Sequence, residues 1–312
     1  MNDQEKYLFD IHGYLVVKNA LTEAQVKALS DMVDANARPA APVSKANPMM
    51  KEGKKRASGR GGSDRTRFRN EDDPAWSASS LLDWGGPFID LIDIPTIAPY
   101  LEELIGAHYR LDHDYMLVAN AESNHQLFLH GGGQGAGGPN DLVGPTDGGQ
   151  CYYRYNNGKF YNGLVAVAFE LNTVTPGDGG FACVAGSHKA NFPLPKEWKM
   201  SETQADLPDC VHRVAAEAGD AIIFTEACAH GTVPWESDER ERRTLFYKYC
   251  PHAVAWSPCY YNSDHYEGLS ENQRNILMPP SAFGPSEPTT EIWRRAQAEQ
   301  AELMRLREEQ AG

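Results

Sequence analysis

Short strand-like segments recur from Tyr109 onward, and they constrain the fold more than any other feature of the chain. Each is apolar or β-branched and is bounded by Gly, Pro, Asn or Asp, as β-strands commonly are. No helical pattern separates them, which favours an antiparallel sandwich or jelly roll over a doubly wound parallel sheet. These segments are YRLDHDYMLVAN, GLVAVAFEL, GFACVAG, HRVAAEAGDAIIF and RTLFYKYC.

Helical patterns flank this β-rich region. After a short apolar strand at residues 13–17, Thr22 and Gln25 have the spacing of a capping box, and the apolar residues that follow share one helical face. Residues 97–105 also have one apolar helical face. Residues 289–310 are charged and predict a closing helix.

The chain has a globular composition, with 312 residues of which 41% are hydrophobic and 23% charged. We expect a single domain that is mainly β with flanking helices. Its parts would be an N-terminal helical part to about residue 108, a jelly-roll core over about 109–256, and a C-terminal helical extension over about 257–312.

The net charge of −14 disfavours a nucleic-acid binder, because neutralising phosphates requires a basic surface. The N-terminus lacks a basic region followed by a long apolar one, and no run of about 18 apolar residues occurs. We therefore expect a cytoplasmic protein that does not bind membranes. The six cysteines include no C-x-x-C pair, so reduced thiols are expected rather than a zinc knuckle.

A basic segment interrupts this acidic chain at residues 51–70. It holds eight Lys or Arg against Glu52 and Asp64, together with four glycines. Such a segment is either a solvated loop or a lid that meets an anionic substrate.

Histidines before glycines indicate a metal site. His130 ends the apolar run LFL and precedes GGG, while His230 follows the strand-like segment AIIF and precedes GT. Further along, Arg242 and Thr244 share one face of a strand by period-two alternation. In a jelly-roll enzyme with a 2-oxoacid co-substrate, a histidine would bind iron, and an arginine beside a hydroxyl would bind the far carboxylate. Arg243 is the alternative, but its same-face neighbour Leu245 offers no hydrogen bond.

Three stretches resemble the phytanoyl-CoA dioxygenase family of Fe(II)/2-oxoglutarate-dependent oxygenases. They are FDIHGYLVV with LTEAQVKAL, PGDGGFACVAGSHK, and GDAIIF with HGT and RRT. The resemblance implies a double-stranded β-helix, which is a cupin-like jelly roll, with iron held by a His-x-Asp/Glu motif and a distal histidine. By position His130 matches the first histidine, His230 the distal one, and Arg242 with Thr244 the 2-oxoglutarate anchor.

Gly132 stands where the family has its acidic iron ligand. In one interpretation halide or water fills this vacated slot, and the enzyme halogenates or hydroxylates a C–H bond, since small residues here mark the halogenases. In a second, Asp141 or Asp147 from the following loop becomes the replacement ligand and an ordinary hydroxylase results. In a third, the protein binds a metabolite without oxidising it. The surrounding glycines permit all three.

Candidate substrate contacts surround the predicted metal site. His113 and His125 precede His130 in the chain, and the aromatic and amide residues after the glycine-rich loop are further candidates, with packing as the alternative role. These further candidates are Tyr153, Arg154, Tyr161 and Asn162.

The resemblance implies an oxidoreductase that uses Fe(II), 2-oxoglutarate and O2, with chloride as an added ligand in the halogenase interpretation. The expected partner is a small organic substrate, and the basic segment 51–70 favours an anionic or carrier-linked one. The sequence leaves the oligomeric state open.

Overall fold

A computed structural model gives the structure of the chain. It describes residues 1–36, 76–79, 81–120, 127–131, 151–192, 194–198, 200–201, 203–257, 261–286 and 291–311.

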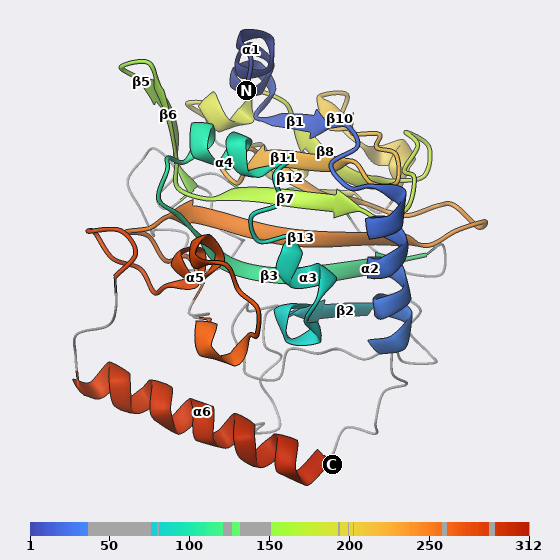
Figure 1. The fold of residues 1–312 in the computed structure, drawn as a ribbon. Coiled ribbons are helices and arrows are strands. Elements are labelled where there is room, and N and C mark those ends of the chain that lie inside the picture. Colours follow the sequence, from blue (N-terminus) through green and yellow to red (C-terminus); the bar gives the residue numbers. More distant parts are fainter. Residues whose placement is uncertain are drawn as a thin grey trace, which may run out of the picture.

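An antiparallel six-stranded sheet organises the fold, with the strand order β1-β11-β7-β13-β3-β2 (Figure 1). The alternating apolar strands of the sequence form its centre, as predicted. In sheet order the bounds are Tyr14–Val17 (β1), Ala221–Thr225 (β11), Val165–Glu170 (β7), Arg242–Pro251 (β13), Tyr109–Ala119 (β3) and Trp76–Ser79 (β2).

A smaller antiparallel sheet lies behind the first and has the order β10-β8-β12 (Figure 1). Two short pairs, β4 with β9 and β5 with β6, complete the strands of the described residues. The bounds are Val211–Arg213 (β10), Gly180–Val184 (β8), His230–Val233 (β12), Leu127–Phe128 (β4), Met200–Ser201 (β9), Tyr153–Asn156 (β5) and Lys159–Asn162 (β6).

Several of the helices pack on the outer face of the main sheet, whereas the C-terminal helix lies apart from it (Figure 1). Short 3-10 helices join several elements. The α-helices are Asp3–His12 (α1), Glu23–Asn36 (α2), Pro87–Asp90 (α3), Ala98–Leu104 (α4), Glu271–Leu277 (α5) and Glu291–Ala311 (α6). The 3-10 helices are Leu81–Trp84, Ser187–Lys189, Lys196–Trp198, Gln204–Asp206 and Ser263–His265. None of the helices in the described ranges is long and apolar enough to cross a membrane.

The predicted capping box at the start of α2 is present. Gln25 donates its backbone N–H to the hydroxyl of Thr22 at 3.2 Å, and its side chain accepts from the Thr22 N–H at 2.9 Å. Leu29 and Val33 then bury one face of the helix against the main core. The helices expected near residues 97–105 and 289–310 are α4 and α6.

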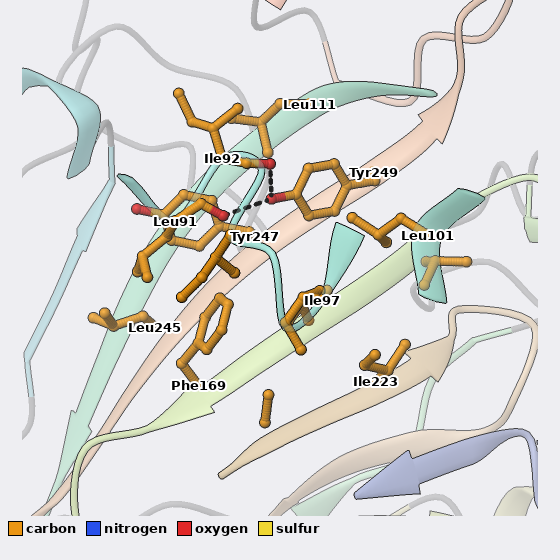
Figure 2. Packing of buried hydrophobic residues seen from close by; sticks show 14 of the residues in the cluster. Leu91, Ile92, Ile97, Leu101, Leu111, Phe169, Ile223, Leu245, Tyr247 and Tyr249 are labelled. Atoms are coloured by element: carbon orange, nitrogen blue, oxygen red, sulfur yellow. Dashed lines mark hydrogen bonds between the residues drawn. The ribbon is translucent and has the colours of Figure 1, made fainter. Parts of the chain in front are cut away.

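Strand alternation divides the buried residues between two faces of the main sheet. Leu245, Tyr247 and Tyr249 of β13 pack under the helices, where the hydroxyl of Tyr249 donates to the carbonyl of Ile92 at 2.9 Å (Figure 2). Phe246 points the other way, into a cluster shared with Phe181 of the smaller sheet. Polar residues with the parity of Phe246 therefore face the space between the two sheets, which is the interior of the jelly roll.

Candidate active site

The two predicted metal ligands are adjacent in the structure. The N–H of His130 donates to the carbonyl of His230 at 2.9 Å, and the N–H of His230 donates back at 2.8 Å. Their ring centroids are 4.4 Å apart with a 50° angle between the planes. Residues from the end of β4 and the start of β12 thus present two imidazoles at one point, as the metal-site hypothesis requires.

His230 is buried and its ring orientation is fixed. Its Nδ1 lies 2.8 Å from the carbonyl of Cys228, and because a carbonyl can only accept, Nδ1 carries the hydrogen. Nε2 is then left as the ligand atom, which is the usual arrangement for a metal-binding histidine. The rings of Phe224 and Phe181 lie 4.7 and 6.2 Å from the imidazole. Burial lowers the pKa of His230 to about 3, so the ring is neutral near pH 7.

Gly131 permits the close approach of the two histidine segments. Its φ is +128°, and a Cβ placed there would lie 2.3 Å from the carbonyl oxygen of Cys228. A side chain at this position would therefore collide with the backbone that orients His230.

Arg242 and Thr244 share the interior face of β13, as predicted, and both are bound to the protein's own Glu170. Nη2 of Arg242 donates to Oε1 of Glu170 at 2.6 Å, and the Thr244 hydroxyl donates to Oε2 at 2.6 Å. All three side chains are buried. Glu170 ends β7, which is paired with β13 at Thr244. Arg242 and Thr244, which were predicted to bind the carboxylate of a co-substrate, thus bind the carboxylate of Glu170 in this structure.

The guanidinium of Arg242 keeps a further donor for a ligand. Its Nε is buried and has no hydrogen-bond partner among the described residues. Gly180 lies beside it, and even a Cβ there would approach Nε to 3.3 Å. A buried, unpaired guanidinium N–H is costly, so the donor chemistry fits the carboxylate of a 2-oxoacid.

Arg243, the alternative anchor, points to the other side of the sheet. Its guanidinium binds Asp34 of α2 at 2.7 Å and Glu241 at 2.5 Å. Strand parity therefore puts Arg242, and not its neighbour, in the interior.

A second ion pair lies in the interior beside His230. Glu226 and Lys248 are both buried, and the Lys248 Nζ is 2.5 Å from Oε1 of Glu226. The same Oε1 lies 3.6 Å from Nε2 of His230. Sequence reasoning missed these two residues and Glu170. Lys248 has the strand parity of Arg242, and Glu226 precedes His230 by four positions, so their spacing was the available signal.

His113 lies on the same interior face, next to this ion pair. It is the β-sheet partner of Lys248, its Nδ1 is 2.7 Å from a carboxylate oxygen of Asp112, and its ring stacks on Tyr115. Burial lowers its pKa, although the Asp112 hydrogen bond opposes that shift. His113 therefore lies near the candidate site, and its role as a substrate contact stays a prediction.

The other predicted substrate contacts that the structure describes make their contacts elsewhere. Tyr153 donates its hydroxyl to Asp10 of α1 at 2.5 Å, and Asn162 donates to the carbonyl of Leu104 at 2.8 Å. Arg154 and Tyr161 are exposed on the β5–β6 hairpin. The hydrogen bonds of Tyr153 and Asn162 join the β5–β6 hairpin to α1 and α4, which is a structural role.

Several predicted positions lie outside the described residues. These are Gly132, Asp141, Asp147, His125 and the basic segment 51–70.

Comparison with known families supports the predicted resemblance. Residues 142–244 match the family described as phytanoyl-CoA dioxygenase (PhyH). The resemblance to the phytanoyl-CoA dioxygenase family is confirmed. The matched residues include β7, β8, His230 and the Arg242–Thr244 pair. No curated protein gives a significant match.

Solved structures share the jelly roll of this chain. HygX from Streptomyces hygroscopicus with nickel and 2-oxoglutarate bound has a TM-score of 0.61 at 21% identity, over 88% of this chain and 94% of its own. The 2-oxoglutarate-dependent carbocyclase SnoK from nogalamycin biosynthesis has a TM-score of 0.52 at 15% identity, over 92% and 94%. At these identities the likeness establishes the fold, which is the predicted one.

Proposed function

We propose that this chain is a non-haem Fe(II)- and 2-oxoglutarate-dependent oxidoreductase that oxidises a C–H bond of a small organic substrate. The observation that carries the proposal is the convergence of His130 and His230, joined by two backbone hydrogen bonds. The PhyH match and the fold shared with HygX and SnoK support the same activity.

Each residue of the site has a separate role in this proposal. His130 and His230 would hold Fe(II), and the carbonyl of Cys228 keeps Nε2 of His230 available as a ligand. Arg242, through its unpaired Nε, and Thr244 would bind the distal carboxylate of 2-oxoglutarate. When bound together with O2, iron and the oxoacid supply the oxidant.

Apolar rings shield the ligand histidine from water. Phe181 and Phe224 flank His230 between the two sheets, and both are buried. A dry surrounding strengthens the electrostatic interactions of the site and limits side reactions.

The proposed substrate is a small molecule that is anionic or carrier-linked, as the basic segment 51–70 of the sequence suggests. The structure of HygX with nickel, 2-oxoglutarate and hygromycin B bound, with a TM-score of 0.62, supports a small-molecule substrate. The reaction is hydroxylation or halogenation according to what fills the third ligand position.

A second candidate function is metabolite binding without turnover. The observation in its favour is that Glu170 already engages both Arg242 and Thr244. A 2-oxoacid would then have to share the guanidinium with Glu170 or displace it.

Conversion of 2-oxoglutarate to succinate separates the two functions. Purified protein is incubated with Fe(II), 2-oxoglutarate and air, with and without chloride, and succinate is quantified against the His230→Ala variant. The oxygenase forms succinate slowly even without its substrate, and the variant forms none above background. Equal background in both proteins would contradict the oxygenase and favour the binding protein.

A further inference from the structure

One peptide unit carries both the hydrogen bond that orients His230 and a second hydrogen bond to Ser187. Its carbonyl belongs to Cys228 and lies 2.8 Å from Nδ1 of His230. Its N–H belongs to Ala229 and donates to the hydroxyl oxygen of Ser187 at 2.7 Å. Because a peptide unit is planar, a bond that fixes its N–H also fixes the direction of its carbonyl. The Ser187 hydroxyl and the His230 imidazole therefore hold opposite edges of the same plane.

The hydroxyl hydrogen of Ser187 has its own acceptor. Sγ of Cys228 lies 3.3 Å from the Ser187 hydroxyl and 3.3 Å from the carbonyl of Val184. A carbonyl only accepts, so the thiol donates to Val184 and its sulfur accepts from the hydroxyl. Ser187 thus uses its hydroxyl as acceptor and as donor within the segment that precedes His230, which fixes the side-chain rotamer.

The backbone around Ser187 is joined to neighbouring elements. The 3-10 helix Ser187–Lys189 begins after Gly186, whose φ is +83° and whose N–H donates to the carbonyl of His12 at 3.1 Å. At the end of β8, the N–H of Val184 donates to the carbonyl of Ala229 at 2.8 Å. The chain after β8 and the segment before β12 are therefore joined on both sides of the turn, which gives the hydroxyl a defined position.

The carbonyl of Cys228 is enclosed on the side of the first histidine as well. A Cβ placed at Gly131 would lie 2.3 Å from this oxygen, so the backbone next to His130 passes close to the same peptide unit. A tilt of the peptide would disturb both histidine segments at once. Its orientation therefore matters to the whole candidate site.

We propose that Ser187 is a positioning residue of the active site, which holds the Cys228–Ala229 peptide so that Nδ1 of His230 carries the hydrogen and Nε2 keeps its lone pair. The inference rests on the proposed function and deepens it, because a lone pair on Nε2 is what a metal-binding histidine needs. Ser187 acts through the peptide and is not itself a ligand. The proposal also gives a role to the end of the stretch PGDGGFACVAGSHK.

Loss of the Ser187 hydroxyl would leave the N–H of Ala229 without this acceptor. Ala229 is buried, and a buried N–H without an acceptor is costly, so the peptide unit would tilt toward another acceptor. The carbonyl of Cys228 would turn with it, and its hydrogen bond to Nδ1 of His230 would weaken. The imidazole hydrogen would then divide between the two ring nitrogens, since the partner of one nitrogen decides the tautomer.

The tautomer of His230 tests this role in metal-free protein. NMR spectra of protein with 15N-labelled histidine distinguish Nδ1–H from Nε2–H, and the signals of His230 are assigned by their loss in His230→Gln. We expect Nδ1–H alone in the wild type. In Ser187→Ala the two nitrogen resonances should move toward each other as the Nε2–H form becomes populated. Wild-type resonances in Ser187→Ala, or an Nε2–H ring in the wild type, would overturn the inference.

Ser187→Thr is the conservative variant. Threonine keeps the hydroxyl, so the Nδ1–H resonances of the wild type should be retained. A shift as large as that of Ser187→Ala would show that the hydroxyl is not what holds the peptide, and it would overturn the inference.

Ser270→Ala is the matched control. The hydroxyl of Ser270 also accepts a backbone N–H, that of Gln273 at 3.1 Å, but it does so at the start of α5. Its substitution should leave the resonances of His230 unchanged. Equal shifts in Ser270→Ala and Ser187→Ala would show a general effect of losing a hydroxyl that accepts a backbone N–H, and the inference would fail.

Metal affinity separates the inference from the proposed function. Mn(II) binding in the presence of 2-oxoglutarate is measured by anaerobic calorimetry for the wild type, Ser187→Ala and Ser187→Thr. We expect Kd for Mn(II) to rise at least about 10-fold in Ser187→Ala and to stay close to the wild-type value in Ser187→Thr. A wild type that does not bind Mn(II) would contradict the proposed function. Wild-type binding that Ser187→Ala leaves intact would overturn the inference alone.

Discussion

His130 and His230 are tied to each other through their own backbones. Each N–H donates to the carbonyl of the other residue, at 2.9 and 2.8 Å, so an antiparallel bridge holds the two backbones side by side. If the two histidines bind a metal ion as proposed, this bridge positions them before the metal arrives, which favours tight binding.

Gly131→Ala should disrupt this bridge. The new methyl group would meet the carbonyl of Cys228, and its φ of +128° is unfavourable for alanine. We expect a loss of about 2–4 kcal/mol in the free energy of unfolding by urea denaturation. Gly158→Ala is the control, because Gly158 has a φ of +74° with open space around it and should lose only about 1 kcal/mol. Equal losses would show that the close approach to Cys228 does not matter.

Glu170→Gln should strengthen 2-oxoglutarate binding. The substitution removes the negative charge that now engages Arg242 and Thr244, so the oxoacid no longer competes with it. We expect Kd for 2-oxoglutarate, measured by calorimetry with Mn(II) present, to fall about 10-fold, which corresponds to about 1.4 kcal/mol. Weaker binding would instead mean that Glu170 orients Arg242 for the ligand.

Arg242→Met and Arg243→Met should differ sharply in stability. The first leaves the buried carboxylate of Glu170 without its cation, which costs about 3–5 kcal/mol. The second removes pairs that are partly exposed to solvent and costs less than about 1 kcal/mol. Urea denaturation of both variants measures the difference, and similar losses would contradict the burial of the Arg242 pair.

The pH dependence of stability should carry a contribution from His230. Burial lowers its pKa to about 3 in the folded protein, whereas an unfolded histidine titrates near 6.5. The unfolded chain therefore binds a proton first, and stability falls as pH decreases below about 6.5, by about 1.4 kcal/mol per pH unit between pH 6 and 4. In metal-free protein, His230→Gln should flatten this slope relative to the wild type. Parallel slopes would show that His230 is protonated in the folded state.

Local patterns in the sequence predicted the β architecture, whereas the convergence of the two histidines was predicted from the resemblance to a known family. Period-two alternation identified the strands and selected Arg242 over Arg243, and the capping box marked the start of α2. The partner of Arg242 was not predictable in this way. Glu170 ends an otherwise apolar strand, and only the pairing of β7 with β13 brings it to Thr244.

Glu226 was missed for a related reason. Asp141 and Asp147 were the expected replacement acids because they follow Gly132 closely in the chain, and a single sequence shows only such proximity. The bridge between His130 and His230 places Glu226, from the segment before the distal histidine, with its Oε1 3.6 Å from Nε2 of His230. Strand pairing between segments far apart in the sequence brings such residues together, and only the folded structure shows this pairing.

The central claim is that His130 and His230 hold Fe(II) to which 2-oxoglutarate binds. Its most direct test is an anaerobic titration of the protein with Fe(II) and 2-oxoglutarate, followed by visible absorption. We predict a charge-transfer band that needs both additions, saturates at one iron per chain and is absent in His230→Ala. A wild-type protein that develops no band, or a His230→Ala variant that develops the same one, would contradict the account.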